Sequence, residues 1–183
     1  KTNLLEGIYF LSLLRSFRTT QISDLCRWRE RSFIVAGELI GEETLRLGVE
    51  YGERRRWRVN GESVARASDF IGRLHCAAFA PEDLALIQGP GGGRRRFLDM
   101  TLSQLYPEYL GALQEYQKVL KSRASLLRQR QNAATQLKAF DSVLVTKGAI
   151  LNRFRDEFFA EFRPALQAVG REYYPADLTL DLQ

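Results

Sequence analysis

Arginine side chains are the groups in this sequence best suited to binding chemistry, and one set follows a glycine-rich stretch. Arg94, Arg95 and Arg96 come directly after "GPGGG" and before an apolar helical pattern, so we expect them on the first turn of a helix. Three positive charges at that end oppose the helix dipole, and a bound anion would offset this. The helix N-terminus, the flexible glycines and the guanidinium groups together predict a phosphate site, for a nucleotide or for a DNA backbone.

A second set of arginines lies around a tryptophan in a stretch that we expect to form a β-hairpin. They are on both sides of Trp57: Arg54, Arg55, Arg56 and Arg58. A solvated strand with one charged face is one interpretation, and contact with DNA is the other. Lys121 and Arg123, on a predicted long helix, leave the same two interpretations open.

Lys1 and Thr2 stand at the head of a predicted helix. The apolar residues that follow them have helical spacing: Leu4, Leu5, Ile8, Leu11 and Leu14. A Lys-Thr pair before such a helix is how the phosphate loop G-x-x-x-x-G-K-[ST] ends. The glycines of that motif are not in the sequence, and an exposed helix start often carries a lysine and a capping threonine.

The composition favours an anionic partner and excludes several kinds of site. The net charge is +5, with 22 Arg against 5 Lys, and planar guanidinium groups suit phosphate recognition. No apolar stretch is long enough to cross a membrane, and these residues contain no charged-then-apolar leader pattern. Cys26 and Cys76 are predicted to be free thiols in a reducing cytoplasm. The only histidine, His75, lies in the apolar run "LHCAAF", so we expect core packing there rather than zinc. No catalytic residues stand out.

The first 89 residues are expected to mix helix and antiparallel sheet. "FIVAGELI" and "TLRLGVEY" read as strands, and Asn60-Gly61 predicts a type I′ hairpin between two shorter strands. One helical turn capped by Ser68 or Asp69 follows, then "LHCAAF" as a buried strand that ends at Pro81, then a helix over "PEDLALIQG".

The remainder is expected to be mainly helical. Apolar spacing predicts two long helices, over about 107–133 and from 135 or 139 to 170, with an interruption near Gly148. We expect them to form an antiparallel arm. "LTLDLQ" at the end alternates like a strand. The predicted organisation is therefore residues 1–89 as part of a head, 90–175 as a helical lobe, and 176–183 as a strand that returns to the head.

Four stretches in this order resemble the RecF family of bacterial recombination mediators. They are "KTNLLEGIYFLSLLRSFRT", "VNG" in the hairpin, "FAPEDLALIQGPGGGRRRFLD" and "YQKVLKSRASLLR". Ala124 and Ser125 depart from the Asn-Ala pair that is usual in the last motif. The resemblance implies an α/β (α+β) fold, an incomplete ABC-type ATPase head similar to those of SMC and Rad50 proteins, with an antiparallel sheet and an inserted helical arm.

The resemblance also implies what the protein binds. RecF-like proteins bind ATP and Mg²⁺, form a homodimer around ATP, bind single-stranded DNA and single-strand/double-strand junctions, and work in the cytoplasm with RecR and RecO to load recombinase. By position, Lys1 would contact the β- and γ-phosphates and Thr2 would hold Mg²⁺. Glu82 would lie in the loop that senses the nucleotide, where related heads have Gln. Arg94 to Asp99 match the family's basic motif.

The sequence lacks several motifs of a complete head. The phosphate-loop glycines, the signature motif and the Walker B acids are not in it, so we expect weak or no nucleotide binding and no ATP hydrolysis by this chain alone, and a weak ATPase in the intact protein. Two alternatives remain. One is a basic scaffold that docks a protein partner without a nucleotide, and the other is another SMC- or Rad50-like head. Steep salt dependence of DNA binding would favour the DNA-binding hypothesis over the scaffold.

Overall fold

The computed structural model describes residues 1–129 and 134–173. It contains two compact units, Lys1–Leu110 (unit 1) and a second that begins at Gly111 (unit 2). Unit 1 is a mixed helix and sheet unit, and the described part of unit 2 is helical. We expected the helical lobe to begin at residue 90, but the helix over Gly91–Leu105 belongs to unit 1.

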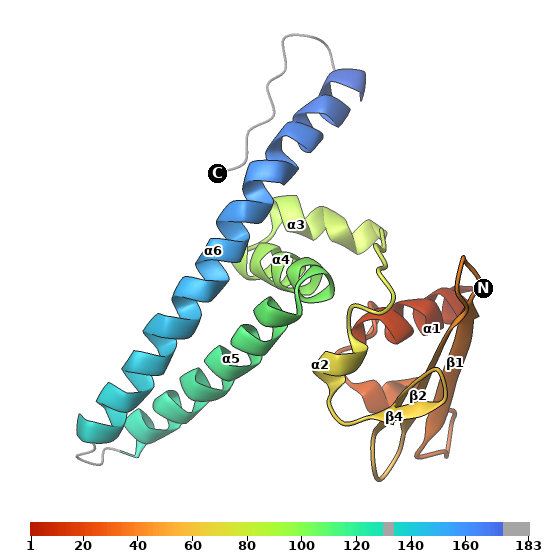
Figure 1. The fold of residues 1–183 in the computed structure, drawn as a ribbon, viewed down its shortest axis with the longest axis horizontal. Coiled ribbons are helices and arrows are strands. Elements are labelled where there is room, and N and C mark those ends of the chain that lie inside the picture. Colours follow the sequence, from red (N-terminus) through yellow and green to blue (C-terminus); the bar gives the residue numbers. More distant parts are fainter. Residues whose placement is uncertain (130–133, 174–183) are drawn as a thin grey trace. The chain divides into compact units, whose positions relative to one another are not determined.

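The sheet of unit 1 has four antiparallel strands in sequence order, as Figure 1 shows. They are β1 (Phe33–Leu39), β2 (Leu45–Tyr51), β3 (Arg56–Val59) and β4 (Glu62–Val64). Asn60 and Gly61 join β3 to β4 with φ values of 52° and 87°. Two consecutive positive φ angles are those of a type I′ turn, so the predicted hairpin is confirmed.

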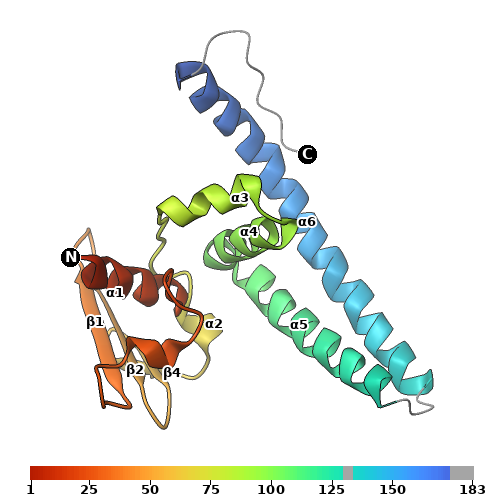
Figure 2. The ribbon, with the colours of Figure 1, turned by 180° about the vertical axis from the view of Figure 1, so that it is seen from behind.

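Helix α1 (Thr2–Leu13) lies across one face of this sheet (Figures 1 and 2). Strand residues alternate between faces, so Leu47 and Val49 point to the helix and pack with Phe10, Leu11 and Phe70. Apart from Glu6, the buried residues of the helix lie in its second half. The apolar residues of its first half are exposed: Leu4, Leu5 and Ile8.

Two short helical turns flank the strands. The 3₁₀ turn η1 (Ile22–Leu25) precedes β1, and α2 (Ala67–Phe70) follows β4. The N-cap of α2 is Arg66, without a side-chain cap, so the predicted cap at Ser68 or Asp69 is wrong. The N-cap lies at least two residues earlier than predicted, which places both side chains inside the first turn, where Asp69 accepts a hydrogen bond from Arg66.

The expected buried strand over "LHCAAF" is also wrong. Residues 73–80 form no helix or strand, His75 is exposed, and Phe79 is 89% exposed. The main chain here bonds to side chains instead of to a neighbouring strand. Ser12 Oγ donates to Leu74 O at 2.8 Å, and the Cys76 N–H donates to Gln104 Oε1 at 2.8 Å.

Three helical segments complete unit 1. They are the 3₁₀ turn η2 (Pro81–Leu84), α3 (Ala85–Gln88) and α4 (Gly91–Leu105). The helical start at Pro81 and the stop at Gly89 agree with the prediction. The glycines 91–93 do not form a flexible loop, because they make the first turn of α4. The three arginines therefore begin its second turn rather than its first.

Unit 2 contains a pair of long antiparallel helices, drawn side by side in Figures 1 and 2. They are α5 (Pro107–Arg128), whose first residues belong to unit 1, and α6 (Ala134–Tyr173). Glu115 pairs with Lys147 at 2.8 Å and Arg123 with Asp141 at 2.7 Å, which is antiparallel register. Helix α6 continues through Gly148 and Pro164, so the predicted interruption near Gly148 is wrong. The strand predicted over 176–183 lies outside the described residues.

Candidate functional site

Lys1 and Thr2 lie at the exposed N-terminus of α1. Lys1 is the N-cap residue, and its carbonyl accepts hydrogen bonds from the N–H groups of Leu4 at 3.1 Å and Leu5 at 3.3 Å. No side chain caps the helix. An uncapped helix start carries partial positive charge and unbonded N–H groups. An ammonium and a hydroxyl group therefore stand where an anion is favoured.

A buried carboxylate holds this end of α1 to the loop that follows it. Glu6 is only 7% exposed. Its carboxylate accepts a hydrogen bond from the Ser16 hydroxyl and pairs with Arg18 Nη1 at 3.3 Å. Arg18 also donates to Asn3 Oδ1 at 3.2 Å. The sequence analysis missed this group, although an acid on the apolar face of a helix is a signal for a buried partner.

The arginines of α4 have different surroundings. Arg94 Nη1 donates to Leu86 O at 3.2 Å and to Gly89 O at 3.1 Å, so it satisfies carbonyls at the end of α3. Guanidinium nitrogens of Arg94 and Arg95 both approach Gly91, because a Cβ built there would lie 3.6 and 3.7 Å from them. Two guanidinium groups thus gather at the helix N-terminus, and one of them is already bonded.

Arg96 acts electrostatically on α1. Burial raises the pKa of the Tyr9 hydroxyl, and the positive charge of Arg96 partly offsets this effect. The Tyr9 hydroxyl also contacts Met100 Sδ at 3.7 Å. Arg96 therefore lies on the side of α4 that faces α1, whereas Arg94 turns towards α3.

Gln104 connects α4 to the rest of unit 1. Its side-chain Oε1 lies 2.7 Å from Ser12 Oγ in α1 and 2.8 Å from the Cys76 nitrogen. Its main-chain oxygen lies 3.1 Å from His75 Nε2. Since Ser12 is fully buried and Gln104 is 9% exposed, these bonds fix α4 relative to α1.

The hairpin arginines lie at the end of the sheet where β2 ends and β3 begins. Arg55 lies over the ring of Tyr51, with its Cζ 5.3 Å from the ring centroid. Arg56 pairs with Glu50 at 3.4 Å, and Arg54 has no partner among the described residues. Arg55 and Arg56 therefore contact side chains of the sheet, and contact of the hairpin arginines with DNA stays a prediction.

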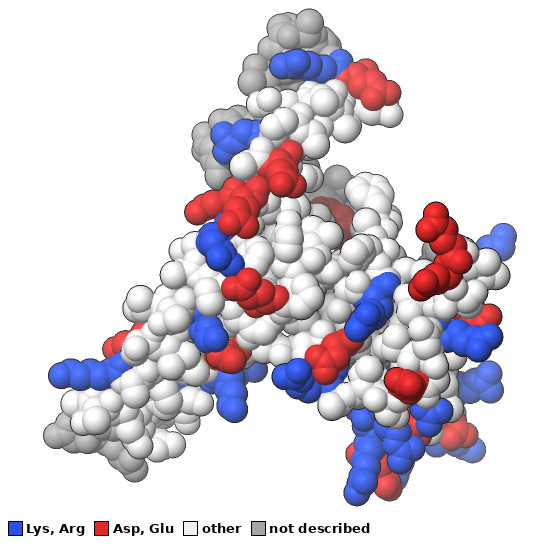
Figure 3. Space-filling view, viewed as in Figure 1, with Lys and Arg blue, Asp and Glu red and all other residues white. Residues whose placement is uncertain are grey.

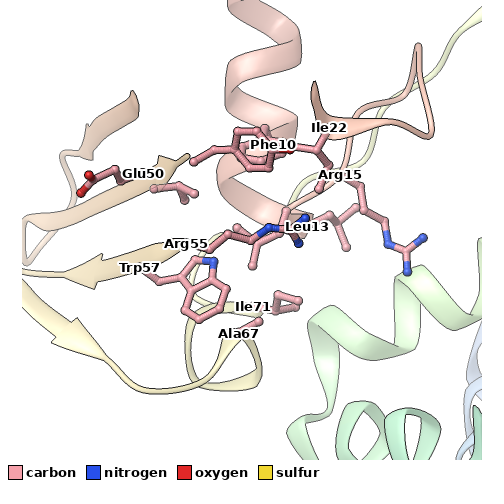
Figure 4. A pocket seen from close by; sticks show the side chains of 12 residues that line it. Phe10, Leu13, Arg15, Ile22, Glu50, Arg55, Trp57, Ala67 and Ile71 are labelled. Atoms are coloured by element: carbon pink, nitrogen blue, oxygen red, sulfur yellow. The ribbon is translucent and has the colours of Figure 1, made fainter. Parts of the chain in front are cut away.

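Beside these arginines lies a cavity of about 180 Å³. Figure 4 shows Arg55 extending from the β2–β3 turn towards Leu13 at the end of α1, with Trp57 below it. Phe10 and Ile71 line the same cavity, together with the charged side chains of Arg15, Arg55 and Glu50. The pocket therefore combines apolar walls with two guanidinium groups and one carboxylate.

The predicted site residues form separate groups. Lys1 and Thr2 are at the start of α1, while Arg55 is near its end, so the helix length separates them by about 17 Å. In unit 2, Lys121 is exposed, and Arg123 forms an ion pair with Asp141. Glu82 lies in η2, and its side chain is outside what the structure describes. The described residues contain no cluster of metal ligands.

Sequence comparison finds relatives that share one description, DNA replication and repair protein RecF. The chain is 34% identical over 184 residues to the protein of Myxococcus xanthus, which covers 96% of this chain and 48% of the relative. It is 39% identical over 161 residues to that of Streptococcus gordonii, covering 86% of this chain and 45% of the relative. The chain spans about half the length of the curated relatives it matches. No family model matches the sequence.

Structure comparison agrees with the sequence comparison. Two solved structures, described as the recombination mediator protein RecF with ATPrS and with ATP in the RecFOR pathway, superpose with a TM-score of 0.87. Their identities to the chain are 28% and 27%, and each match covers 94% of this chain and 48% of the solved one. The predicted mixed fold of a partial RecF head is thereby confirmed. This chain belongs to the RecF family.

Proposed function

We propose that this chain is part of an ATP-dependent DNA-binding protein of DNA replication and recombinational repair, which binds single-stranded DNA and gap junctions and promotes recombinase loading. One observation carries the proposal: the fold matches RecF structures described with ATP over 94% of the chain. The net charge of +5 and the free guanidinium groups support an anionic partner.

The proposed nucleotide site is the N-terminus of α1. Lys1 and Thr2 are exposed there beside unbonded helix N–H groups, and this set of donors fits a triphosphate with Mg²⁺. Lys1 would neutralise the β- and γ-phosphates, and the Thr2 hydroxyl would hold the metal ion. The Glu6–Arg18 pair keeps this end of the helix in place. The homodimer is proposed to form around the bound nucleotide, and Glu82 is proposed to lie in the loop that would sense it.

The proposed DNA contacts come from the hairpin arginines and from α4. Arg54 and Arg55 make no ion pair with a described acid, so their charges remain available for phosphates. Arg95 and Arg96 are exposed on α4, with Lys121 as a further contact on α5. Arg56, Arg94 and Arg123 already have partners in the chain, so each would contribute to DNA binding only partly. RecR and RecO are the proposed protein partners, in the cytoplasm.

The test measures the effect of Mg-ATP on DNA affinity. The protein, as the cell makes it, is titrated against a labelled gapped duplex with and without Mg-ATP. We expect ATP to tighten binding, and Lys1→Ala to remove this effect while the affinity without ATP is unchanged. Lys118→Ala is the matched control, because it also removes one exposed lysine, and it should keep the ATP effect.

Two results would contradict the proposal in different ways. Affinity for the gapped duplex that does not respond to ATP would favour a nucleotide-independent scaffold. An ATP effect that survives Lys1→Ala would keep the function and remove Lys1 from the nucleotide site.

A further inference from the structure

Trp28 is presented to solvent at the tip of a tight turn. Trp28 is 89% exposed, although tryptophan usually buries most of its surface in folded proteins. The Glu30 N–H donates to Arg27 O at 2.9 Å and closes the turn. Arg29, its third residue, has φ 70°, the left-handed conformation that a type II turn requires and that arginine seldom adopts. The backbone therefore holds Trp28 outwards at a local conformational cost.

Positive charges surround this ring. Arg27, Arg29 and Arg31 alternate with Trp28 and Glu30, and all are exposed. None of the three arginines pairs with an acid in the part of the chain that the structure describes. Glu30 offsets only part of their mutual repulsion, so an anion bound here would lower the energy of the surface.

The β2–β3 turn extends the same surface. Phe33 pairs with Tyr51 in the sheet, and their rings stack at 5.1 Å. A Cβ built on Gly52 would lie 3.3 Å from Ser32 Cβ, so the segments next to the two turns are in contact. Arg54 follows Gly52 by two residues, and Trp28 precedes Ser32 by four. Figure 3 shows Lys and Arg side chains crowded at the end of unit 1 where β1 begins.

We propose that Trp28 is a stacking platform for an unpaired base of single-stranded DNA, with the flanking arginines on the phosphates: Arg27, Arg29, Arg31 and Arg54. The inference rests on the proposed DNA-binding function and gives it a site. An exposed aromatic ring among basic side chains is the arrangement by which proteins bind single strands without reading their sequence. A duplex keeps its bases inside the stack, so it would use the arginines and leave the ring unused.

The experiment compares Trp28 variants for a labelled dT oligonucleotide, using the protein as the cell makes it. Trp28→Ala is expected to weaken binding about 5- to 150-fold, the range for loss of one stacked base. Trp28→Phe should restore most of the affinity, because it keeps an aromatic face. Phe79→Ala is the matched control: Phe79 is also 89% exposed but has no neighbouring arginines in sequence, and it should change affinity less than twofold.

An oligonucleotide of abasic sites separates stacking from charge. It keeps the phosphates, so wild type and Trp28→Ala should bind it equally, and with the same dependence on salt. The thermal midpoint of Trp28→Ala should match that of wild type, since the ring is almost fully solvated.

The outcomes distinguish the inference from the proposed function. If wild type binds dT oligonucleotides and Trp28→Ala binds them equally well, the stacking site is wrong and the function stands. If Trp28→Ala also weakens binding to the abasic strand by the same factor, the ring does not act on bases and the inference is wrong. If wild type binds no DNA at low salt, the proposed function itself fails.

Discussion

The substitution Gly72→Ala tests how α4 packs within unit 1, because it disturbs a contact of Gln104 near the end of that helix. Gly72 has φ 88°, and a Cβ built on it would lie 2.7 Å from Gln104 O. No Cβ approaches a carbonyl oxygen so closely, so the variant must move either the segment that contains Gly72 or the end of α4. The same oxygen contacts His75 Nε2 at 3.1 Å, and that contact would be strained as well.

The expected loss of stability has two parts. A left-handed residue with a Cβ costs about 1–2 kcal/mol, and forcing an additional carbon into a packed contact costs about 1–3 kcal/mol. Gly72→Ala should therefore lower the free energy of unfolding of unit 1 by about 2–5 kcal/mol. Gly61 is the matched control: its φ is 87°, and nothing lies within 4 Å of its Cβ position. Gly61→Ala should lose only the free energy that a Cβ costs in the left-handed conformation.

Urea unfolding followed by tryptophan fluorescence measures both variants. Trp28 and Trp57 both belong to unit 1, so the signal reports that unit. The free-energy difference between the two variants is the cost of the contact with Gln104. Equal losses for Gly72→Ala and Gly61→Ala would refute the close packing of α4 against this segment.

Three further predictions concern charge and hydrogen bonding. Burial raises the pKa of Tyr9 above its ordinary 10.0, so the folded state keeps a proton that the unfolded chain loses. Stability should fall as the pH rises above 10, and less so in Tyr9→Phe, as alkaline unfolding curves will show. Arg94→Ala removes two hydrogen bonds to carbonyls and should cost about 1 kcal/mol in urea unfolding, whereas Arg95→Ala should cost less than about 0.5 kcal/mol. Equal costs would contradict this difference. A double-mutant cycle on Glu115 and Lys147, 2.8 Å apart, should give a coupling of about 0.2–1 kcal/mol that weakens with salt; zero coupling at low salt would argue against the antiparallel register.

The parts of the fold that the sequence could predict are those with local causes. Asn60-Gly61 determines its turn because both residues tolerate positive φ. The two long helices follow from apolar spacing alone, although Gly148 and Pro164 do not break α6. The helical turns on both sides hold a single weak residue inside a long helix.

The failures have non-local causes. An apolar run such as "LHCAAF" indicates a strand only if another strand pairs with it, and here Ser12 and Gln104 bond to its main chain. Gly91 to Gly93 favour a loop by propensity, but they form the first turn of α4. The packing of the later part of α4, where Leu102, Ser103 and Gln104 are buried, stabilises the helix as a whole.

The candidate site shows the same division. Residue type identified the arginines as anion binders, but it could not tell that Arg94 bonds to carbonyls or that Arg56 pairs with Glu50. These assignments depend on where α3 and β2 lie. Trp28 was missed because its importance comes from the turn that exposes it. The alternation of Arg and Trp in "RWRER" was the available signal.

The central claim is that the arginines beside the sheet bind a DNA backbone, and the salt dependence of DNA affinity tests it most directly. The dissociation constant for a dT oligonucleotide is measured over a series of salt concentrations, for wild type and for a variant with alanine at positions 27, 29, 31 and 54. Four phosphate contacts contribute about −3 to the slope of log affinity against log salt for a single strand. The account predicts that the variant's slope is shallower by about 3; equal slopes for the two proteins would contradict it.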